Sequence, residues 1–102
     1  MPWMGPVVTH NPQAARFEAL LSTPAGERLA ICSYRLHGGV LVLHHTEVPA
    51  ALQGQGVAAR LVEAALAWAR EHGLQVRPTC SYVAAYMRRH PQTQDLLEVA
   101  RH

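Results

Sequence analysis

The sequence predicts an α/β (α+β) fold, a mixed, mostly antiparallel sheet with one βαβ crossover and flanking helices. Short apolar runs alternate with turn residues over residues 7–47, which is typical of an antiparallel meander. Apolar residues then recur at helical spacing over residues 56–72, and a further apolar run follows at residues 74–79. Because 49% of the 102 residues are hydrophobic, we expect one core and a single domain over residues 1–102.

The strands of the meander are expected at residues 17–21, 29–36 and 40–47. A Thr-Pro-Ala-Gly turn separates the first two, and a His-Gly-Gly turn separates the second from the third. Adjacent glycines between apolar runs predict a hairpin, because glycine adopts positive φ without steric cost. Pro49 lacks a backbone donor and should end the third strand.

The crossover begins with a helix over residues 56–72, and Gly73 suits the position just past its end. The strand at residues 74–79 should run parallel to the third strand, which puts the loop before the helix at the carboxyl edge of the sheet, where ligands bind. A second helix is expected over residues 81–89, because Pro91 follows it. The apolar positions of the two helices are Val57, Leu61, Val62, Ala65, Leu66, Trp68 and Ala69, and then Val83, Tyr86 and Met87.

The charge pattern argues against nucleic-acid binding. The formal net charge of +2 comes from nine Arg, no Lys and seven acidic residues, and the arginines form no basic stripe. Cys32 and Cys80 match neither a redox pair nor a zinc-ligand spacing, so a reducing cytoplasm fits best. Residues 1–6 carry no basic side chain and no apolar run is long enough to cross a bilayer, so we expect neither a secretory leader nor a membrane span.

A glycine-rich stretch immediately before the first helix is the main candidate for ligand binding. Such a junction presents unpaired backbone N–H groups and the positive helix end, which suit a pyrophosphate. The alternative is that the glycines only turn the chain. Neither a Gly-Lys-Ser/Thr run nor the three-glycine dinucleotide pattern is present, which disfavours nucleoside triphosphates and nicotinamide cofactors. The stretch comprises Gln53, Gly54, Gln55, Gly56, Val57 and Ala58.

This Gln-x-x-Gly-x-Ala stretch resembles the acetyl-CoA pyrophosphate motif of the GNAT superfamily of N-acetyltransferases. Residues 46–49 and 52–58, and a Cys-x-x-Val-x-x-Tyr-x-x-Arg-His-Pro segment at residues 80–91, are similar to a compact, single-domain branch of that superfamily. The resemblance covers roughly residues 33–97. It implies a sheet splayed around bound acetyl-CoA, and transfer of an acetyl group to an amine.

The resemblance also assigns residues to the site. In the superfamily the end of the strand before the loop orients the pantetheine and the thioester, which points to Thr46, Glu47 and Val48. Members commonly use a Tyr in the following helix to protonate the departing CoA thiolate, and Tyr86 matches it. In the compact branch a Cys at the position of Cys80 is the suspected catalytic residue, and the helix N-terminus would stabilise its thiolate.

Each catalytic assignment has a plainer alternative. Cys80 would be a small buried residue if the acetyl group passes directly to the amine, and Tyr86 would be a core residue. Glu47 would act as a general base in a partly dry site, and is otherwise a solvated carboxylate. His45 shares a strand face with Glu47 and is a candidate proton relay, whereas His90 is expected beside the last carbonyls of the second helix.

Arginines supply further candidate phosphate contacts, because guanidinium groups bind phosphate bidentately. Arg60 lies on the first helical turn, and Arg88 or Arg89 lies on the second helix, although solvated surface charge is the default for each. His44 and His45 are adjacent on a strand, so their side chains should point to opposite faces and cannot hold one metal ion. We therefore expect no metal.

Two functions stay open. One is an acetyl-CoA-dependent N-acetyltransferase that passes the acetyl group to an amine directly or after transfer to Cys80. The other is a non-catalytic acyl-CoA-binding or protein-interaction module, which the short stretch before Phe17 favours because many superfamily members wall the acceptor site with helices there. Ala59 stands where many members carry a hydroxyl, which would weaken cofactor binding. The acceptor is not identified, and we expect a monomer or weak homodimer.

Overall fold

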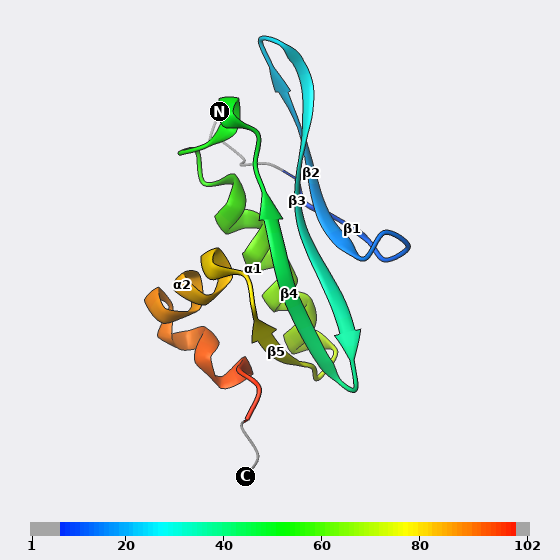
Figure 1. Ribbon diagram of the computed structural model, residues 1–102, viewed down its shortest axis with the longest axis vertical. Coiled ribbons are helices and arrows are strands. Elements are labelled where there is room, and N and C mark those ends of the chain that lie inside the picture. The colour runs from blue at the N-terminus through cyan, green and yellow to red at the C-terminus, as the bar shows by residue number, and fades with distance from the viewer. Residues whose placement is uncertain (1–6, 100–102) are drawn as a thin grey trace.

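A computed structural model describes residues 7–99, and the opening segment from which no leader was expected lies outside them (Figure 1). Five strands form one sheet in the order β1-β2-β3-β4-β5. Neighbours are antiparallel from β1 to β4, and β4 and β5 are parallel, which confirms the mixed sheet with one crossover. The strands are β1 (Thr9–Asn11), β2 (Arg16–Thr23), β3 (Gly26–His37), β4 (Val40–Glu47) and β5 (Gln75–Pro78).

Two α-helices and two short 3₁₀ helices complete the fold. Helix α1 (Val57–Glu71) makes the crossover, and α2 (Ser81–Arg89) follows β5. The 3₁₀ helices are η1 (Ala50–Leu52), before the glycine-rich loop, and η2 (Pro91–Leu96), after α2. Within residues 7–99 the structure holds no helix with the length and apolar character needed to span a membrane.

The helices bury their apolar faces in one core on one side of the sheet. Figure 1 shows α1 lying behind β4, and residues of α1 and α2 share a cluster with the inward-facing side chains of β2, β3 and β4. The strand residues of this core are Phe17, Ala19, Ala30, Cys32, Tyr34, Leu41, Leu43 and Val76.

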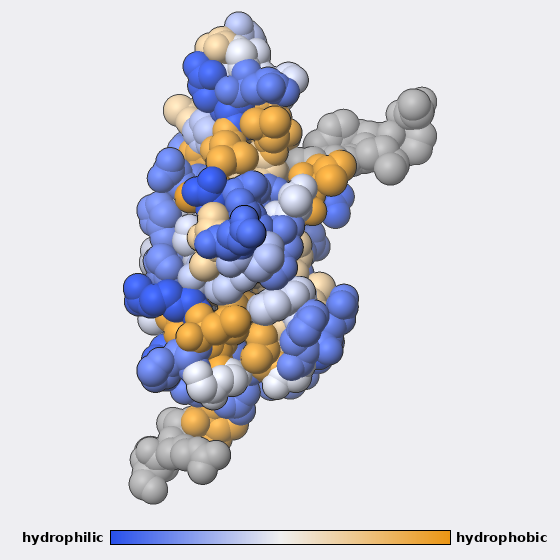
Figure 2. All heavy atoms as spheres, turned by 90° about the vertical axis from the view of Figure 1, so that its right-hand side faces the viewer, coloured by the Kyte–Doolittle hydropathy of each residue, from blue (hydrophilic) through white to orange (hydrophobic). Residues whose placement is uncertain are grey.

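The other side of the sheet, here called the open face, carries the alternating residues of the same strands. Leu20 and Leu29 pair across β2 and β3 on this face and are 60% and 37% exposed. Figure 2 shows apolar side chains at the surface just below the tip of the β2–β3 hairpin. Six residues further along β3 from Leu29, Arg35 lies on the open face in one row with Val42 and Arg77.

A bulge interrupts β4 and changes which residues face the core. Tyr34 pairs with Leu43 and Ser33 pairs with His45, so His44 is one extra residue on β4. Leu43 and Thr46, opposite buried Cys32, therefore both face the core side, and His44 and His45 both lie between them. The expectation that the two histidines point to opposite faces is wrong, because a bulge breaks the two-residue alternation of a strand.

Both helix C-termini are capped by histidine. His72 Nδ1 donates to the carbonyl of Trp68 at 2.9 Å, and His90 Nδ1 donates to the carbonyl of Tyr86 at 2.7 Å. The Trp68 carbonyl also accepts the backbone N–H of His72 at 3.1 Å, so the His72 ring adds a second donor to a carbonyl in the last turn of α1. The placement of His90 beside the last carbonyls of the second helix is confirmed. Gly73 adopts φ 64° just past α1, as its position predicts.

Candidate functional site

The parallel strands β4 and β5 diverge after Leu43. Their pairing runs from Val40 opposite Gln75 to Leu43 opposite Pro78, while β4 continues to Glu47. The Leu43 carbonyl accepts the backbone N–H of Cys80 at 3.0 Å, which holds the start of α2 at the point of divergence. The last four residues of β4 therefore have no partner in β5, and the place at the carboxyl edge of the sheet where the two strands diverge is called the gap below.

Three side chains meet at this gap. Thr46 Oγ1 lies 3.5 Å from Cys80 Sγ and 3.9 Å from Cys32 Sγ. Cys32 is fully buried, Cys80 is partly buried, and both are free thiols. We had assigned Thr46 as a backbone position and had assigned Cys32 no role, but the bulge turns the Thr46 hydroxyl inward between the two sulfurs.

The two thiols differ in acidity. Burial disfavours the Cys80 thiolate and is the largest single influence on it, but the Thr46 hydroxyl and the backbone amides of Val83, Tyr82 and Thr46 together outweigh burial and lower the pKa of Cys80. Cys80 is the N-cap of α2, where the positive helix end favours an anion. Burial raises the pKa of Cys32 to about 11, so that thiol stays protonated.

The glycine-rich loop forms the second part of the site. Gly54 and Gly56 have φ values of 81° and 78°, and Gly56 is the N-cap of α1. The first helical hydrogen bond runs from the Arg60 amide to the Gly56 carbonyl at 3.1 Å, so the amides of residues 57–59 have no partner within the helix. No acidic residue stands in the first turn. These features fit a phosphate anion.

The glutamines of the loop act as internal braces. Gln53 Nε2 donates to the Val48 carbonyl at 3.1 Å, and Gln55 Nε2 donates to the Ala51 carbonyl at 3.3 Å. Each bond crosses from the loop back to the segment that follows β4. One N–H of each side-chain amide is thus used within the chain, and the backbone amides at the start of α1 are the main donors left for an anion.

Glu47 and His45 form an exposed pair at the end of β4. His45 Nε2 lies 3.2 Å from Glu47 Oε1, which confirms that the two side chains share a face. The Glu47 side chain is 66% exposed and the His45 side chain is 53% exposed. The protein's own atoms therefore do not provide the dry surroundings that we had set as the condition for Glu47 to act as a general base.

Tyr86 lies on α2 where that helix packs against α1. Its ring is buried, stacks on His90 with centroids 3.9 Å apart, and lines a cavity with Glu63 and Arg70 of α1. Burial raises the pKa of Tyr86, which keeps the phenol protonated as an acid must be. Among residues 7–99, no hydrogen bond joins Tyr86 to Cys80 or Thr46, so the structure does not bring these candidates together directly.

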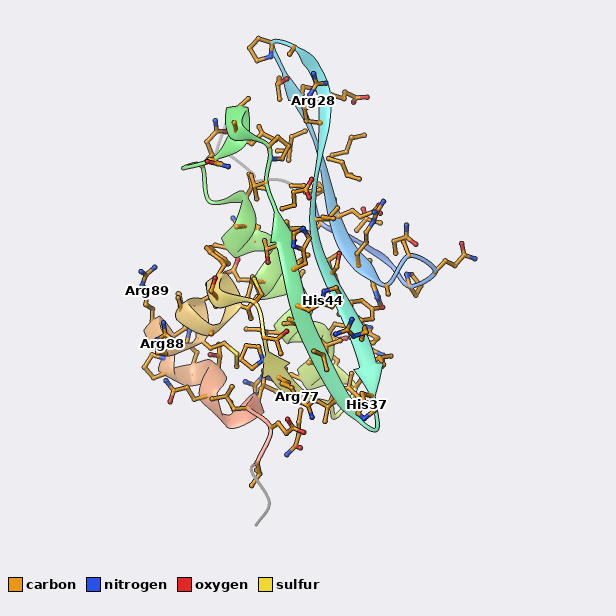
Figure 3. All side chains as sticks on the ribbon, viewed as in Figure 1. Arg28, His37, His44, Arg77, Arg88 and Arg89 are labelled. Carbon is orange, nitrogen blue, oxygen red and sulfur yellow. The ribbon has the colours of Figure 1, made fainter. Side chains whose placement is uncertain are left out.

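The arginines occupy different surroundings. Arg60 lies 3.7 Å from Glu63 on the exposed side of α1. Arg88 lines a cavity with Pro78 and Gln94, on the side of α2 that faces the C-terminal segment. Arg89 is near enough to Tyr82 to influence its ionisation and thus lies on the face of α2 that carries both tyrosines. Figure 3 places Arg88 and Arg89 at the outer end of α2, and both stay candidates for a phosphate contact.

Comparison with known proteins identifies the family. The sequence profile of the GCN5-related N-acetyl-transferase family matches residues 16–96. The chain belongs to the GCN5-related N-acetyltransferase family. Mouse Protein NATD1 is 36% identical over 94 residues, covering 90% of this chain and 84% of the mouse protein. Human Protein NATD1 is 40% identical over 68 residues, covering 66% and 60%.

A solved structure agrees with this family at the level of the fold. The solution NMR structure of a GCN5-like protein from Staphylococcus aureus matches with a TM-score of 0.71 and 25% identity, covering 97% of this chain and 95% of the other. The family match includes every candidate residue from Thr46 to Arg89. Within residues 7–99, no group of three or more His, Cys, Asp or Glu side chains is arranged to hold a metal ion.

The low pKa of Cys80 in this GCN5-related protein predicts a measurable pH profile. Alkylation by iodoacetamide should reach half its maximal rate below the pH typical of a free thiol, because the thiolate is the reactive form. Replacing Thr46 by valine, which keeps the shape and removes the hydroxyl, should move the profile to higher pH and slow alkylation several-fold at neutral pH. Thr46→Ser should restore it. Identical profiles for all three proteins would show that the Thr46 hydroxyl does not act on Cys80.

Proposed function

We propose that this protein transfers an acetyl group from acetyl-CoA to an amine and that Cys80 carries the group between them. The observation that supports this most strongly is the position of the Cys80 sulfur. It lies where β4 and β5 diverge, at the N-terminus of α2 and 3.5 Å from Thr46 Oγ1. Membership of the GCN5-related family and the free amides of the neighbouring loop support the same function.

Acetyl-CoA supplies an acetyl group activated as a thioester. In this proposal the amides of residues 57–59 hold the pyrophosphate, and the edge of β4 from Thr46 to Val48 holds the pantetheine. Arg60, Arg88 and Arg89 are the candidate cationic contacts. The glycine conformations at positions 54 and 56 keep the loop in the shape that exposes these amides.

The residues of the gap have distinct tasks. The Cys80 thiolate attacks the thioester carbonyl, a new carbon–sulfur bond forms, and CoA leaves as a thiolate that Tyr86 protonates when the substrate draws the two together. The amine then attacks the acetyl carbonyl, and Cys80 departs as the thiolate that its low pKa favours. The proton released by the amine passes to the exposed His45–Glu47 pair at the same strand end and returns through solvent to the Tyr86 phenolate, which restores the phenol.

Calorimetric titration with acetyl-CoA is the first test. Saturable binding is expected, whereas acetate plus an adenine nucleotide, the control for non-specific phosphate binding, should bind far more weakly. Absence of binding would contradict the proposal outright.

Release of CoA in the presence of amines is the second test, and it distinguishes an enzyme from a binding module. Catalysis predicts continuous release that depends on the amine, and mass spectrometry of the protein stopped without amine should find an acetyl group on Cys80. Binding without release would favour the non-catalytic module. That module is the competing function because, within residues 7–99, no helix lies over the open face.

A further inference from the structure

The open face carries two arginines in one row across three strands. Arg35 of β3 pairs with Val42 of β4, and Val42 pairs with Arg77 of β5. Strands in a sheet lie about 4.8 Å apart, so the two arginine Cα atoms are about 10 Å apart on either side of Val42. Side chains of this length can converge on one small anion from that separation. Val42 is only 5% exposed although no helix covers it, which is consistent with arginine stems lying over it.

A cavity of about 230 Å³ opens between these side chains. Figure 3 shows His37 and Arg77 near the lower end of β4, at the opposite end of β3 from Arg28, with His44 further up β4. The floor is apolar and the walls are basic. The lining residues are Arg35, Leu36, His37, Val42, Arg77 and Thr79.

The cavity keeps an excess of positive charge. Arg77 donates to both carboxylate oxygens of Glu98 at 2.7 and 2.8 Å, and His37 lies near the same carboxylate. In the part of the chain that the structure describes, no ion pair includes Arg35. The Glu98 carboxylate thus offsets the charge of Arg77, and the guanidinium group of Arg35 leaves one positive charge for a ligand.

The cavity adjoins the gap that holds Cys80. Thr79, which lines the cavity, is the residue before Cys80, and its hydroxyl donates to the Leu43 carbonyl at 3.4 Å. Arg77 is three residues from Cys80, which corresponds to about 10 Å of extended chain. The Cys80 sulfur lies on the core side of β4, beside Thr46, and the cavity lies on the open face, so a molecule that reaches both must pass through the place where β4 and β5 diverge.

We propose that the Arg35–Arg77 cavity binds an oxyanion, a carboxylate or a phosphate, carried by the acetyl acceptor at most about 10 Å from its reactive amine. The role in the acceptor rests on the proposed acetyltransferase function, whereas anion binding itself does not. Guanidinium groups bind either oxyanion bidentately. The acceptor class is therefore an acidic amine, and a polyamine would be repelled by the same charges.

Acetylation of matched amines tests the acceptor class. We expect kcat/KM for ε-aminocaproate to exceed that for hexylamine, which lacks the acid, and that for cadaverine, which carries a second cation. Arg35→Gln should lower kcat/KM for ε-aminocaproate about tenfold, the usual loss for a hydrogen bond to a charged group, and should affect hexylamine far less. Arg28→Gln is the matched control, because it removes the same charge from the far end of β3 (Figure 3). Equal rates for ε-aminocaproate and hexylamine would overturn the proposal.

Anion binding is measured separately from catalysis. Titration of the protein with inorganic phosphate and with acetate, followed by NMR, should shift the amide signals of residues 35–37, 42, 77 and 79, and the anion that binds more tightly identifies the group. Arg35→Gln should abolish these shifts and Arg28→Gln should not. If acetyl transfer fails with every amine but these shifts occur, the anion site stands and the proposed function fails. Absence of the shifts in the unmodified protein would overturn the site.

Discussion

Replacing Cys80 by alanine should reduce acetyl transfer at least about a hundredfold while leaving acetyl-CoA binding unchanged, because the nucleophile is lost but the loop is not touched. The side chain is partly buried and small, so its removal costs little packing. The measurement pairs calorimetric titration with the rate of CoA release under saturating amine.

Cys32→Ala is the matched control for this substitution. It removes the other thiol beside Thr46, one that burial keeps protonated and that lies 3.9 Å from the same hydroxyl. Transfer should stay within a few-fold of the unmodified protein once its folding has been verified. If instead Cys80→Ala transfers at the normal rate, the amine attacks the thioester directly and Cys80 is structural.

The order and type of the main elements could be predicted from local patterns. Helix α2 has the expected bounds, Ser81–Arg89, because Pro91 stops it, and α1 differs from the expected helix by one residue at each end. Strands β2 and β3 are longer than expected, since backbone pairing extends through polar residues such as Ser22 and Glu27 towards the hairpin turn. Apolar periodicity does not detect such residues.

Strand β1 was missed for a different reason. Its three residues, Thr9 to Asn11, carry no apolar side chain, and its pairing with β2 is supported by tertiary contacts. The rings of His10 and Phe17 stack with their centroids 4.3 Å apart, and His10 Nε2 lies 2.6 Å from the hydroxyl oxygen of Tyr34. These partners are up to 24 residues away in sequence, so no local sequence pattern indicates the contacts that hold β1.

The parts of the candidate site that lie at the start of a helix could be predicted from the sequence. The parts that depend on the register between strands could not. A glycine-rich loop before a helix and a cysteine before another helix are visible in sequence, and both lie at the carboxyl edge of the sheet. The contact of Thr46 with Cys32 depends on which residue of β4 is the extra one, and a single-residue shift would have turned the Thr46 hydroxyl outward. The row that joins Arg35 to Arg77 depends on the pairing of three strands in the same way.

Replacing Gly56 by valine should weaken acetyl-CoA binding roughly tenfold or more, because the loop can no longer hold its conformation at low cost. A β-branched residue in the left-handed region costs on the order of 1–2 kcal/mol, and relief of that strain would move the amides of residues 57–59. A Cβ at this position meets no atom within 4 Å, so the effect on folding comes from φ and not from a clash. Calorimetric titration gives the affinity, and urea denaturation gives the free energy of unfolding.

Gly39→Val separates backbone strain from loss of the binding loop. Gly39 has φ 82° against 78° for Gly56, and a Cβ there also meets nothing within 4 Å, but it lies in the β3–β4 hairpin at the opposite end of β4 from the gap. Both variants should therefore lose a similar free energy of unfolding, about 1–2 kcal/mol, and only Gly56→Val should lose affinity for acetyl-CoA. Equal affinities in the two variants would mean that residues 53–58 form an ordinary turn, and the anion-binding role of the α1 N-terminus would fall with them.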